Sequence, residues 1–375
     1  MVRVLHFVSR MDRAGQETFI MNVMRHIDRK KVGFCFLCSE AGRGDYDDEI
    51  MALGGAIYYL PKRNDAGRLS KIRGQIVDLA KWLKDNRDKF DIVHLHTYHT
   101  LDVFIHLAAC KRAGVENIVI HSHNTCGPHV FVHKVIGMVC RSFYKFKKLA
   151  CSKVAGEWLF GKRAVRKGEV TVIYNGIDLA DFKYSRERAE EIREKLGLTG
   201  KIVLGHIGRF SEQKNHEFLM DIFAEYVKAH DDAVLLLIGR GELEDRIRAK
   251  AELLDVQSKV RFLGVRDDVK ELLQAMDVFV FPSLYEGLSV VLVEVQASSL
   301  PVVTNENIAE ETIISDGIRL LPIKDVKAWC DCIDDLRKTD RAQIRLTKEK
   351  EFDINSVAEK MQDIYVQMKE DNQCL

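Results

Sequence analysis

Residues 277–304 read DVFVFPSLYEGLSVVLVEVQASSLPVVT, in which a strand, a turn, a helix, a turn and a strand follow one another. Residues 278–281 form an uninterrupted apolar run, as expected of a parallel strand that is buried on both faces. From Leu288 onward the apolar residues recur at helical spacing, so Glu286 lies between the carboxyl end of a strand and the amino end of a helix. Open α/β sheets bind their ligands at this position.

The turn before the predicted helix suits an anionic group, because exposed amides and the positive end of the helix dipole meet there. Glu294 follows Glu286 by eight residues. That interval would span about 12 Å if it were helical throughout, so one long ligand could contact both carboxylates. By themselves, two carboxylates at this spacing favour a helix cap and a solvated helix position.

The composition predicts two large packed domains. The chain has 375 residues, of which 46% are hydrophobic, and an average domain has roughly 150. Lys and Arg number 57 against 56 Asp and Glu, so the chain as a whole lacks the positive excess of a nucleic-acid-binding protein. The apolar run near the amino end is too short for a signal peptide, and no run is long enough to span a membrane. These features predict a cytoplasmic location.

The nine cysteines are scattered through predicted core segments, which favours reduced thiols. Cys35 and Cys38 form a CxxC within a predicted strand, where their side chains would point to opposite faces. No second pair lies at zinc-ribbon spacing, so we expect no zinc site at these cysteines.

Apolar strands alternate with helical patterns along the chain, which predicts two doubly wound parallel sheets. A turn at residues 175–178, Asn-Gly-Ile-Asp, separates the two sets of strands. We therefore predict domains over 1–178 and 179–352, followed by an amphipathic helix over 353–375. The strands expected in the two sheets are 2–8, 32–38, 56–60, 92–95, 118–121, 148–151 and 170–174 in the first, and 202–206, 233–238, 260–262, 278–281, 302–303 and 318–321 in the second.

Histidines gather at the ends of two strands of the first domain, with His94, His96 and His99 after one and His121 and His123 after the other. Such pairs can bind a metal, whereas a single histidine is more often a hydrogen-bonded core residue. Because these histidines lie at carboxyl ends of strands, we expect them to line a cleft rather than a core.

Residues 134–167 carry ten lysines and arginines against one acid, with aromatic residues interleaved. This asymmetry fits an interfacial patch for anionic lipid or for a diphosphate-bearing acceptor. An ordinary solvated helix face is an equally open interpretation. Nucleic acid is a weaker choice, because no recognition motif accompanies the charge.

Each domain has a glycine-containing loop directly after its first predicted strand. The first strand runs into a loop with Gly15, before a helix expected to begin near Thr18, but GxGxxG and a Walker lysine are absent. Neither a dinucleotide nor ATP is therefore indicated. The first strand of the second domain ends in Gly208-Arg209, and Lys214 follows. The planar fork of arginine and the mobile point charge of lysine together suit a diphosphate.

The motifs Asn-Gly-Ile-Asp at 175–178, Gly208-Arg209-(x4)-Lys214 and Glu286-(x7)-Glu294 occur in this order, each at a predicted sheet edge. Together they resemble those of the retaining family-4 glycosyltransferases of GT-B fold, and the resemblance covers nearly the whole chain. It implies two Rossmann-like domains that face a central cleft, with the 353–375 helix crossing back onto the first. The chain has Ala14 and Ser299 where the family has glycine.

The resemblance implies a retaining, metal-independent transfer of a hexosyl group from a nucleotide-diphosphate sugar, with a UDP-sugar favoured. It places Glu286 and His123 at the reacting sugar, and Arg209 and Lys214 at the diphosphate, where they replace a metal ion. No cofactor besides the donor substrate is implied. The other donor-binding positions carried over are Gly15, Gly287, Leu288, Ser289 and, at the ribose, Glu294.

Residues 14–29 and 45–61 resemble the bacterial exopolysaccharide and capsule branch of that family. This branch implies a glycan or polyprenyl-diphosphate-linked acceptor, and a peripheral position on the inner face of the cell membrane. Two alternatives stay open. A GT-B sugar-nucleotide epimerase would need further acid–base residues, and a catalytically silent partner subunit is disfavoured by the intact Arg209, Lys214, Glu286 and Glu294.

Overall fold

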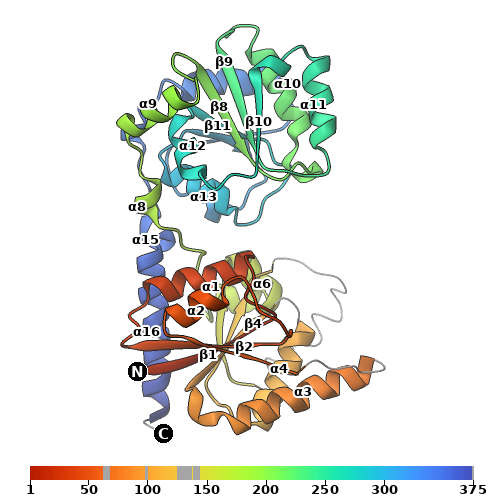
Figure 1. Cartoon of the computed structure of the whole chain (residues 1–375), viewed down its shortest axis with the longest axis vertical. Coiled ribbons are helices and arrows are strands. Elements are labelled where there is room, and N and C mark those ends of the chain that lie inside the picture. The colour runs from red at the N-terminus through yellow and green to blue at the C-terminus, as the bar shows by residue number, and fades with distance from the viewer. Residues whose placement is uncertain (62–67, 98–99, 125–136, 138–143, 374–375) are drawn as a thin grey trace. The chain divides into compact units, whose positions relative to one another are not determined.

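The computed structural model describes residues 1–61, 68–97, 100–124, 137 and 144–373. The chain divides into two compact units, one formed by residues 1–177 with 350–375 and the other by residues 178–349 (Figure 1). The sequence analysis placed the two junctions after residues 178 and 352. Each unit contains one parallel sheet with helices on both faces.

The first sheet has the strand order β3-β2-β1-β4-β5-β6-β7, and all of its strands are parallel. Chain order reverses between β1 and β4, and this reversal is the topological switch point of the sheet. The strand ends lie within two residues of the predicted ones. The strands are β1 (Val2–Val8), β2 (Val32–Cys38), β3 (Ala56–Tyr59), β4 (Ile92–Thr97), β5 (Ile118–Ser122), β6 (Lys147–Ala150) and β7 (Val170–Val172).

The helices of this unit divide between the two faces of the sheet. Two separate cores result, one beneath α1 and α16 and the other beneath α3 and α4. The helices are α1 (Gly15–His26), α2 (Asp47–Ala52), α3 (Arg68–Asp85), α4 (Thr100–Arg112), α6 (Lys153–Phe160), α7 (Lys162–Arg166) and α16 (Ile354–Gln373); α15 (Glu349–Phe352) leads into α16.

Helix α1 begins at Gly15, three residues before the start predicted near Thr18. The Thr18 amide donates to the carbonyl of Ala14 over 2.8 Å, which closes the first turn. Gly15 is therefore the first residue of the helix and not part of a loop. No side-chain cap precedes it, because Ala14 occupies the cap position.

The second sheet has the order β10-β9-β8-β11-β12-β13, with its switch point between β8 and β11. The strands are β8 (Ile202–Ile207), β9 (Ala233–Ile238), β10 (Val260–Gly264), β11 (Val278–Phe281), β12 (Val302–Asn305) and β13 (Ile318–Leu321). The helices are α8 (Leu179–Phe182), α9 (Arg186–Lys195), α10 (His216–Tyr226), α11 (Glu244–Leu253), α12 (Val269–Ala275), α13 (Val290–Ala297) and α14 (Val326–Leu336).

The last helix, α16, packs within the first unit. The Ile177 amide donates to the carbonyl of Phe352, and the Ile354 amide donates to the carbonyl of Ile177. These two bonds attach the start of α16 to the end of the 1–177 segment. The apolar face of the predicted amphipathic helix packs against the core beneath α1, and its members are Ile354, Val357, Met361, Ile364, Tyr365 and Met368.

The expectation that the histidine clusters line a cleft is wrong for His94, His96 and His121, which are buried in the core. Alternate residues of adjacent strands share one face of a sheet, and α1 and α16 cover this face. His123, just beyond β5, is half-buried. His99 lies outside the described residues.

Cys35 and Cys38 lie on opposite faces of β2, each in a different core, as their spacing predicts. Burial raises the pKa of both thiols to about 12. Each thiol is therefore protonated at neutral pH, and because the two lie on opposite faces of the sheet they do not converge on one point.

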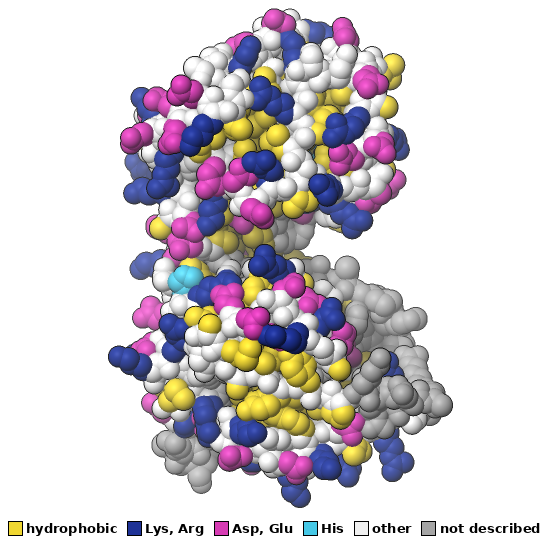
Figure 2. All heavy atoms as spheres, viewed as in Figure 1, with side chains coloured by type: hydrophobic (Ala, Val, Ile, Leu, Met, Phe, Trp, Pro, Cys, Tyr) yellow, Lys and Arg dark blue, Asp and Glu magenta, His cyan; other side chains and the backbone are white. Residues whose placement is uncertain are grey.

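Charged side chains of both signs are mixed over the visible face of the two units (Figure 2), in keeping with the net charge of +1. In the basic segment 134–167, residues 134–136 and 138–143 lie outside the described residues. Among the described helices, none is sufficiently long and apolar to cross a membrane.

Ser299, one of the two departures from the family pattern, follows α13 with a backbone φ of 52°. A side chain with a Cβ is strained in this left-handed region, whereas glycine adopts it readily. The amide of Ser299 donates to the carbonyl of Gln296 over 2.9 Å and so helps to end the helix. This geometry explains why glycine is usual at the position.

We expect Ser299→Gly to stabilise the second unit by about 0.5–1 kcal/mol, because relief of strain outweighs the greater freedom of glycine in the unfolded chain. Trp329 is the one tryptophan of residues 178–349. Urea unfolding followed by its fluorescence, with Trp82 and Trp158 replaced by Phe, measures the effect. Ser299→Ala, which keeps the Cβ, is the control and should give no gain; equal midpoints for Gly and Ala would contradict the explanation.

Candidate functional site

An ion pair lies at the switch point of the second sheet. Lys214 follows β8 and Glu286 follows β11, and the Lys214 Nζ lies 2.6 Å from the Glu286 Oε1. Their side chains are 17% and 8% exposed, respectively. The ammonium also lies 4.7 Å from the ring centre of Phe281. The two predicted residues thus meet where sheets of this kind bind ligands.

Hydrogen bonds between the two loops fix this pair. The Leu284 amide donates to the Gln213 carbonyl over 2.8 Å, and the Gln213 side-chain amide donates to the Tyr285 carbonyl over 3.0 Å. Asn215, with a left-handed φ of 53°, donates from its side chain to the Pro282 carbonyl over 3.2 Å. The loop after β8 is therefore held in register with the loop after β11.

Arg209 combines a fixed backbone with a side chain that is 72% exposed and pairs with Glu242 at 3.0 Å. A Cβ on Gly239 would lie 2.1 Å from the Gly208 carbonyl oxygen, and one on Gly241 would lie 2.4 Å from that of Phe210. Both glycines are therefore required for close approach of the two loops. The guanidinium extends from this rigid base into solvent, where an anionic ligand can reach it.

Helix α13 begins at Val290, so the predicted helical start at Leu288 is wrong. The Ser289 hydroxyl accepts from the Leu292 amide over 3.5 Å and caps the helix instead. Leu288 and Ser289 precede the first turn, and the all-helical separation from Glu286 to Glu294 does not apply.

Gly287 is exposed, its φ lies outside the left-handed region, and an added Cβ would meet nothing within 4 Å. Its carbonyl accepts from the Thr312 hydroxyl over 3.3 Å. The fold itself therefore does not require glycine at this position. A ligand that approaches the backbone closely would require it.

Glu294 lies within α13, and burial raises its pKa to about 7, partly offset by the positive charge of Lys270. The interpretation of this residue as a solvated helix position is therefore wrong. A carboxyl group that titrates near neutrality exchanges between acceptor-only and donor forms.

In the first unit, the beginning of α1 lies near the end of β5. The ring centre of Phe19 in α1 is 5.3 Å from that of His121 and 5.9 Å from that of His123. Gly15 has open space around a would-be Cβ and a φ outside the left-handed region. As at Gly287, the fold sets no requirement for glycine there.

Glu17 is a residue to which the sequence analysis assigned no role. It is buried in the first turn of α1, where its Oε1 accepts from the Gln16 side-chain amide over 3.0 Å. Its Oε2 has no hydrogen-bond partner among the described residues, and burial raises the pKa of the carboxyl group. Its place two residues after Gly15, in the predicted loop that follows the first strand, was the signal that could have identified it.

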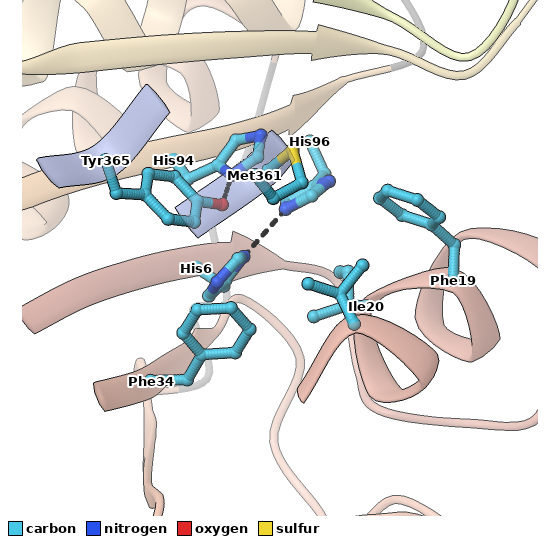
Figure 3. A pocket seen from close by; sticks show the side chains of 9 residues that line it. His6, Phe19, Ile20, Phe34, His94, His96, Met361 and Tyr365 are labelled. Atoms are coloured by element: carbon cyan, nitrogen blue, oxygen red, sulfur yellow. Dashed lines mark hydrogen bonds between the residues drawn. The ribbon is translucent and has the colours of Figure 1, made fainter. Parts of the chain in front are cut away.

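The histidines of the first unit form direct contacts in the core (Figure 3). The Nδ1 of His6 lies 2.9 Å from the Nε2 of His96, and the Nδ1 of His96 lies 3.0 Å from the Nε2 of His123. The Nδ1 of His94 lies 2.7 Å from the Tyr365 hydroxyl of α16. His6 was missed because one histidine in an apolar strand gives no signal of its partners.

Among the described residues, the groups whose donor atoms lie close enough to hold a metal ion consist of histidines alone: His6 with His94 and His96, and His96 with His121 and His123. At Lys214 and Glu286 the described side chains provide instead a cation, a carboxylate and a neighbouring exposed arginine. This set suits an anionic ligand with polar substituents.

Family models match both units. One described as Glycosyltransferase Family 4 matches residues 13–181, and one described as Glycosyl transferases group 1 matches residues 201–339. The Bacillus subtilis protein EpsF, which carries a glycosyltransferase name, is 37% identical over 339 residues, or 88% of this chain and 86% of EpsF. A galactosyltransferase of Escherichia coli, named for UDP-Gal and an α-D-GlcNAc-diphosphoundecaprenol acceptor, is 24% identical over 98% of this chain and 96% of its own length. CapH of Staphylococcus aureus, a capsular polysaccharide biosynthesis glycosyltransferase, is 25% identical over 98% and 99%.

Solved structures share the fold over nearly the whole chain. HepE from Anabaena, crystallised with UDP, has a TM-score of 0.71 at 18% identity and covers 99% of this chain and 98% of its own. A glycosyltransferase from Rickettsia africae has a TM-score of 0.75 at 16% identity and covers 98% of each chain. The GT-B fold expected from the sequence is thus confirmed. With both units matched and EpsF similar over most of its length, the chain belongs to glycosyltransferase family 4.

Proposed function

We propose that the protein transfers a hexosyl group, with retention of configuration, from a UDP-sugar to a hydroxyl of a glycan or polyprenyl-diphosphate-linked saccharide. The observation that carries the proposal is the partly buried pair of Lys214 and Glu286 at the switch point of the second sheet. The names of the E. coli and S. aureus relatives, and the UDP bound to HepE, support the donor, the acceptor and a role in cell-surface polysaccharide synthesis.

In this mechanism the leaving diphosphate accepts the proton of the attacking hydroxyl on the same face of the sugar. Arg209 and Lys214 stabilise the negative charge that develops on the diphosphate, and no metal ion is needed. Arg209 is exposed and only surface-paired, so its guanidinium can turn toward the phosphates. Lys214 already sits between Glu286 and the aromatic ring of Phe281, in a setting where charge is poorly screened.

The remaining residues bind the rest of the donor. Glu286 contacts the reacting sugar. The backbone amides of Gly287, Leu288 and Ser289, in the same loop, also bind the donor. Glu294 accepts hydrogen bonds from the ribose hydroxyls. From the first unit, the proposal assigns Gly15 to close backbone approach and His123 to the sugar.

We also propose that part of the segment 134–167 contacts anionic lipid at the inner face of the membrane. The described portion includes a cluster of exposed cations on and after α7, formed by Lys162, Arg163, Arg166 and Lys167, with the exposed Val154 on α6. Each cation near an anionic surface contributes about 1 kcal/mol. Such contact would bring the enzyme to a lipid-linked acceptor.

Arg209→Ala and Lys214→Ala should each lower kcat by about 10²-fold or more, because each removes charge that stabilises the transition state. The measurement is transfer from radiolabelled UDP-hexoses to a lipid-linked saccharide. The control is Lys250→Ala, which removes a lysine that pairs with Glu217 and Asp221 on α10. Wild-type rates in Arg209→Ala or Lys214→Ala, or an equal loss in the control, would refute the assignment.

The two glutamates should respond differently to removal of their charge. Glu286→Gln should mainly lower kcat, because the contact to the reacting sugar strengthens in the transition state. Glu294→Gln should mainly raise the donor KM, because the ribose undergoes no chemistry. Steady-state kinetics on both variants provide the measurement, and the reverse pattern would mean that the direction of the donor along α13 is wrong.

Binding of UDP should strengthen as the pH rises, because the ionised form of Glu294 accepts hydrogen bonds from both ribose hydroxyls. With a pKa of about 7, the ionised fraction and the affinity should rise about tenfold between pH 6 and pH 8. Calorimetry in buffers of different ionisation enthalpy measures both the affinity and the proton released. Glu294→Gln shows how much of the change comes from UDP itself; an equal pH dependence in that variant would exclude the carboxyl group as its source.

A further inference from the structure

Five histidines cluster on one face of the first sheet, beneath α1 and α16, and Figure 3 shows three of them, His6, His94 and His96. They lie on β1, β4 and β5 and just beyond β5, and they are His6, His94, His96, His121 and His123. Burial lowers the pKa of His6 and of His123 to about 3, and lowers those of the other three well below their ordinary value. At neutral pH each ring is uncharged and carries one ring proton.

Three of these rings form a continuous chain through contacts of 2.9 and 3.0 Å, from His6 through both nitrogens of His96 to His123. Each contact between two ring nitrogens accommodates one proton. Two protons there would clash, and with no proton there the two nitrogen lone pairs would repel each other. With one proton per ring, only two arrangements satisfy both contacts. Either all three rings carry the proton on Nδ1, or all three carry it on Nε2.

The inner end of the chain distinguishes these arrangements. The Nε2 of His6 is buried and has no hydrogen-bond partner among the described residues. The His6 ring lies against Phe34 and Phe36, with ring centres 4.3 and 5.3 Å away. A buried N–H without a partner is rarer in proteins than a buried acceptor without one. The arrangement that leaves a bare nitrogen at this position, with the proton on Nδ1 of every ring, is therefore favoured.

We propose that His6 and His96 are positioning residues that hold His123 in its Nδ1–H tautomer, so that His123 offers a hydrogen-bond donor to an oxygen of the nucleotide sugar. The contact to the sugar rests on the proposed function, whereas the tautomer does not. Neither His6 nor His96 contacts substrate in this scheme. They act through the ring protons that connect them to His123.

Two substitutions of His6, by side chains that are similar in shape to each other, test the hydrogen-bonded chain of three histidines. In His6→Asn the side-chain NH₂ replaces Nδ1–H as donor to the Nε2 of His96, whereas His6→Leu provides no donor. Ring protonation is read directly from two-bond ¹H–¹⁵N correlation spectra of protein labelled at histidine, without any substrate. Thermal unfolding of both variants verifies that they fold, and His106→Leu, a histidine on the opposite face beside Phe7, is the control.

In the wild-type protein and in His6→Asn, His123 and His96 should show the Nδ1–H pattern. In His6→Leu the pattern of His123 should shift toward a mixture of tautomers, and kcat/KM should fall by roughly three- to tenfold, the value of one neutral hydrogen bond. His6→Asn should recover most of this loss, and His106→Leu should retain both the spectrum and the rate.

Three results would overturn the inference: an Nε2–H pattern at His123 in the wild type, a His123 ring unaffected by His6→Leu, or equal rates in His6→Leu and His6→Asn. Nitrogen shifts typical of metal ligation that revert with EDTA would also overturn it, in favour of a metal ion held by His96, His121 and His123. A wild-type protein that is inactive with every UDP-hexose would contradict the proposed function. The ring spectra would still show whether His6 and His96 set the tautomer of His123.

Discussion

Burial of both faces of each parallel sheet is the constraint on which the arrangement of this protein depends. Parallel strands need helical crossovers, so all carboxyl ends in a sheet meet at one edge. The loops after β8 and β11 are neighbours for this reason, although Lys214 and Glu286 are 72 residues apart. The same constraint brings the first turn of α1 close to the end of β5.

The cost of burying charge shapes the second unit. Lys214 and Glu286 are each mostly removed from water, and an ion in such a place is costly unless it is paired. The pair is held by hydrogen bonds between the loops after β8 and β11. Glycines at 239 and 241 let a third loop pack against the backbone of Gly208 and Phe210. Among the described residues Glu294 has no such ion-pair partner, and burial raises its pKa, opposed in part by the positive charge of Lys270.

In the first unit, the buried polar groups beneath α1 and α16 include neutral histidines, so these side chains bury no charge. Imidazole rings fill part of the sheet face beneath α1 and α16, and hydrogen bonds among the rings and with Tyr365 satisfy several of their nitrogens. Because neutral imidazole has one donor and one acceptor, each contact restricts the next one along the chain. The half-buried His123 is thereby coupled to His6 in the core.

The sequence by itself determined the strand alternation, the two sheets and the order of the motifs, because hydrophobic periodicity and turn residues are local signals. It also placed Lys214, Arg209 and Glu286 in loops at the edge of the second sheet, and Glu294 on the helix that follows. Only the tertiary structure decided which of these side chains meet and which are buried. The histidines appeared to line a cleft, because the helix α16 that covers them comes from a distant part of the chain. Helix α13 begins at Val290, capped by Ser289, instead of at Leu288, and His6 joined His96 and His123, for the same reason. Caps, burial and ring contacts depend on neighbours in space, and the sequence pattern records neighbours along the chain.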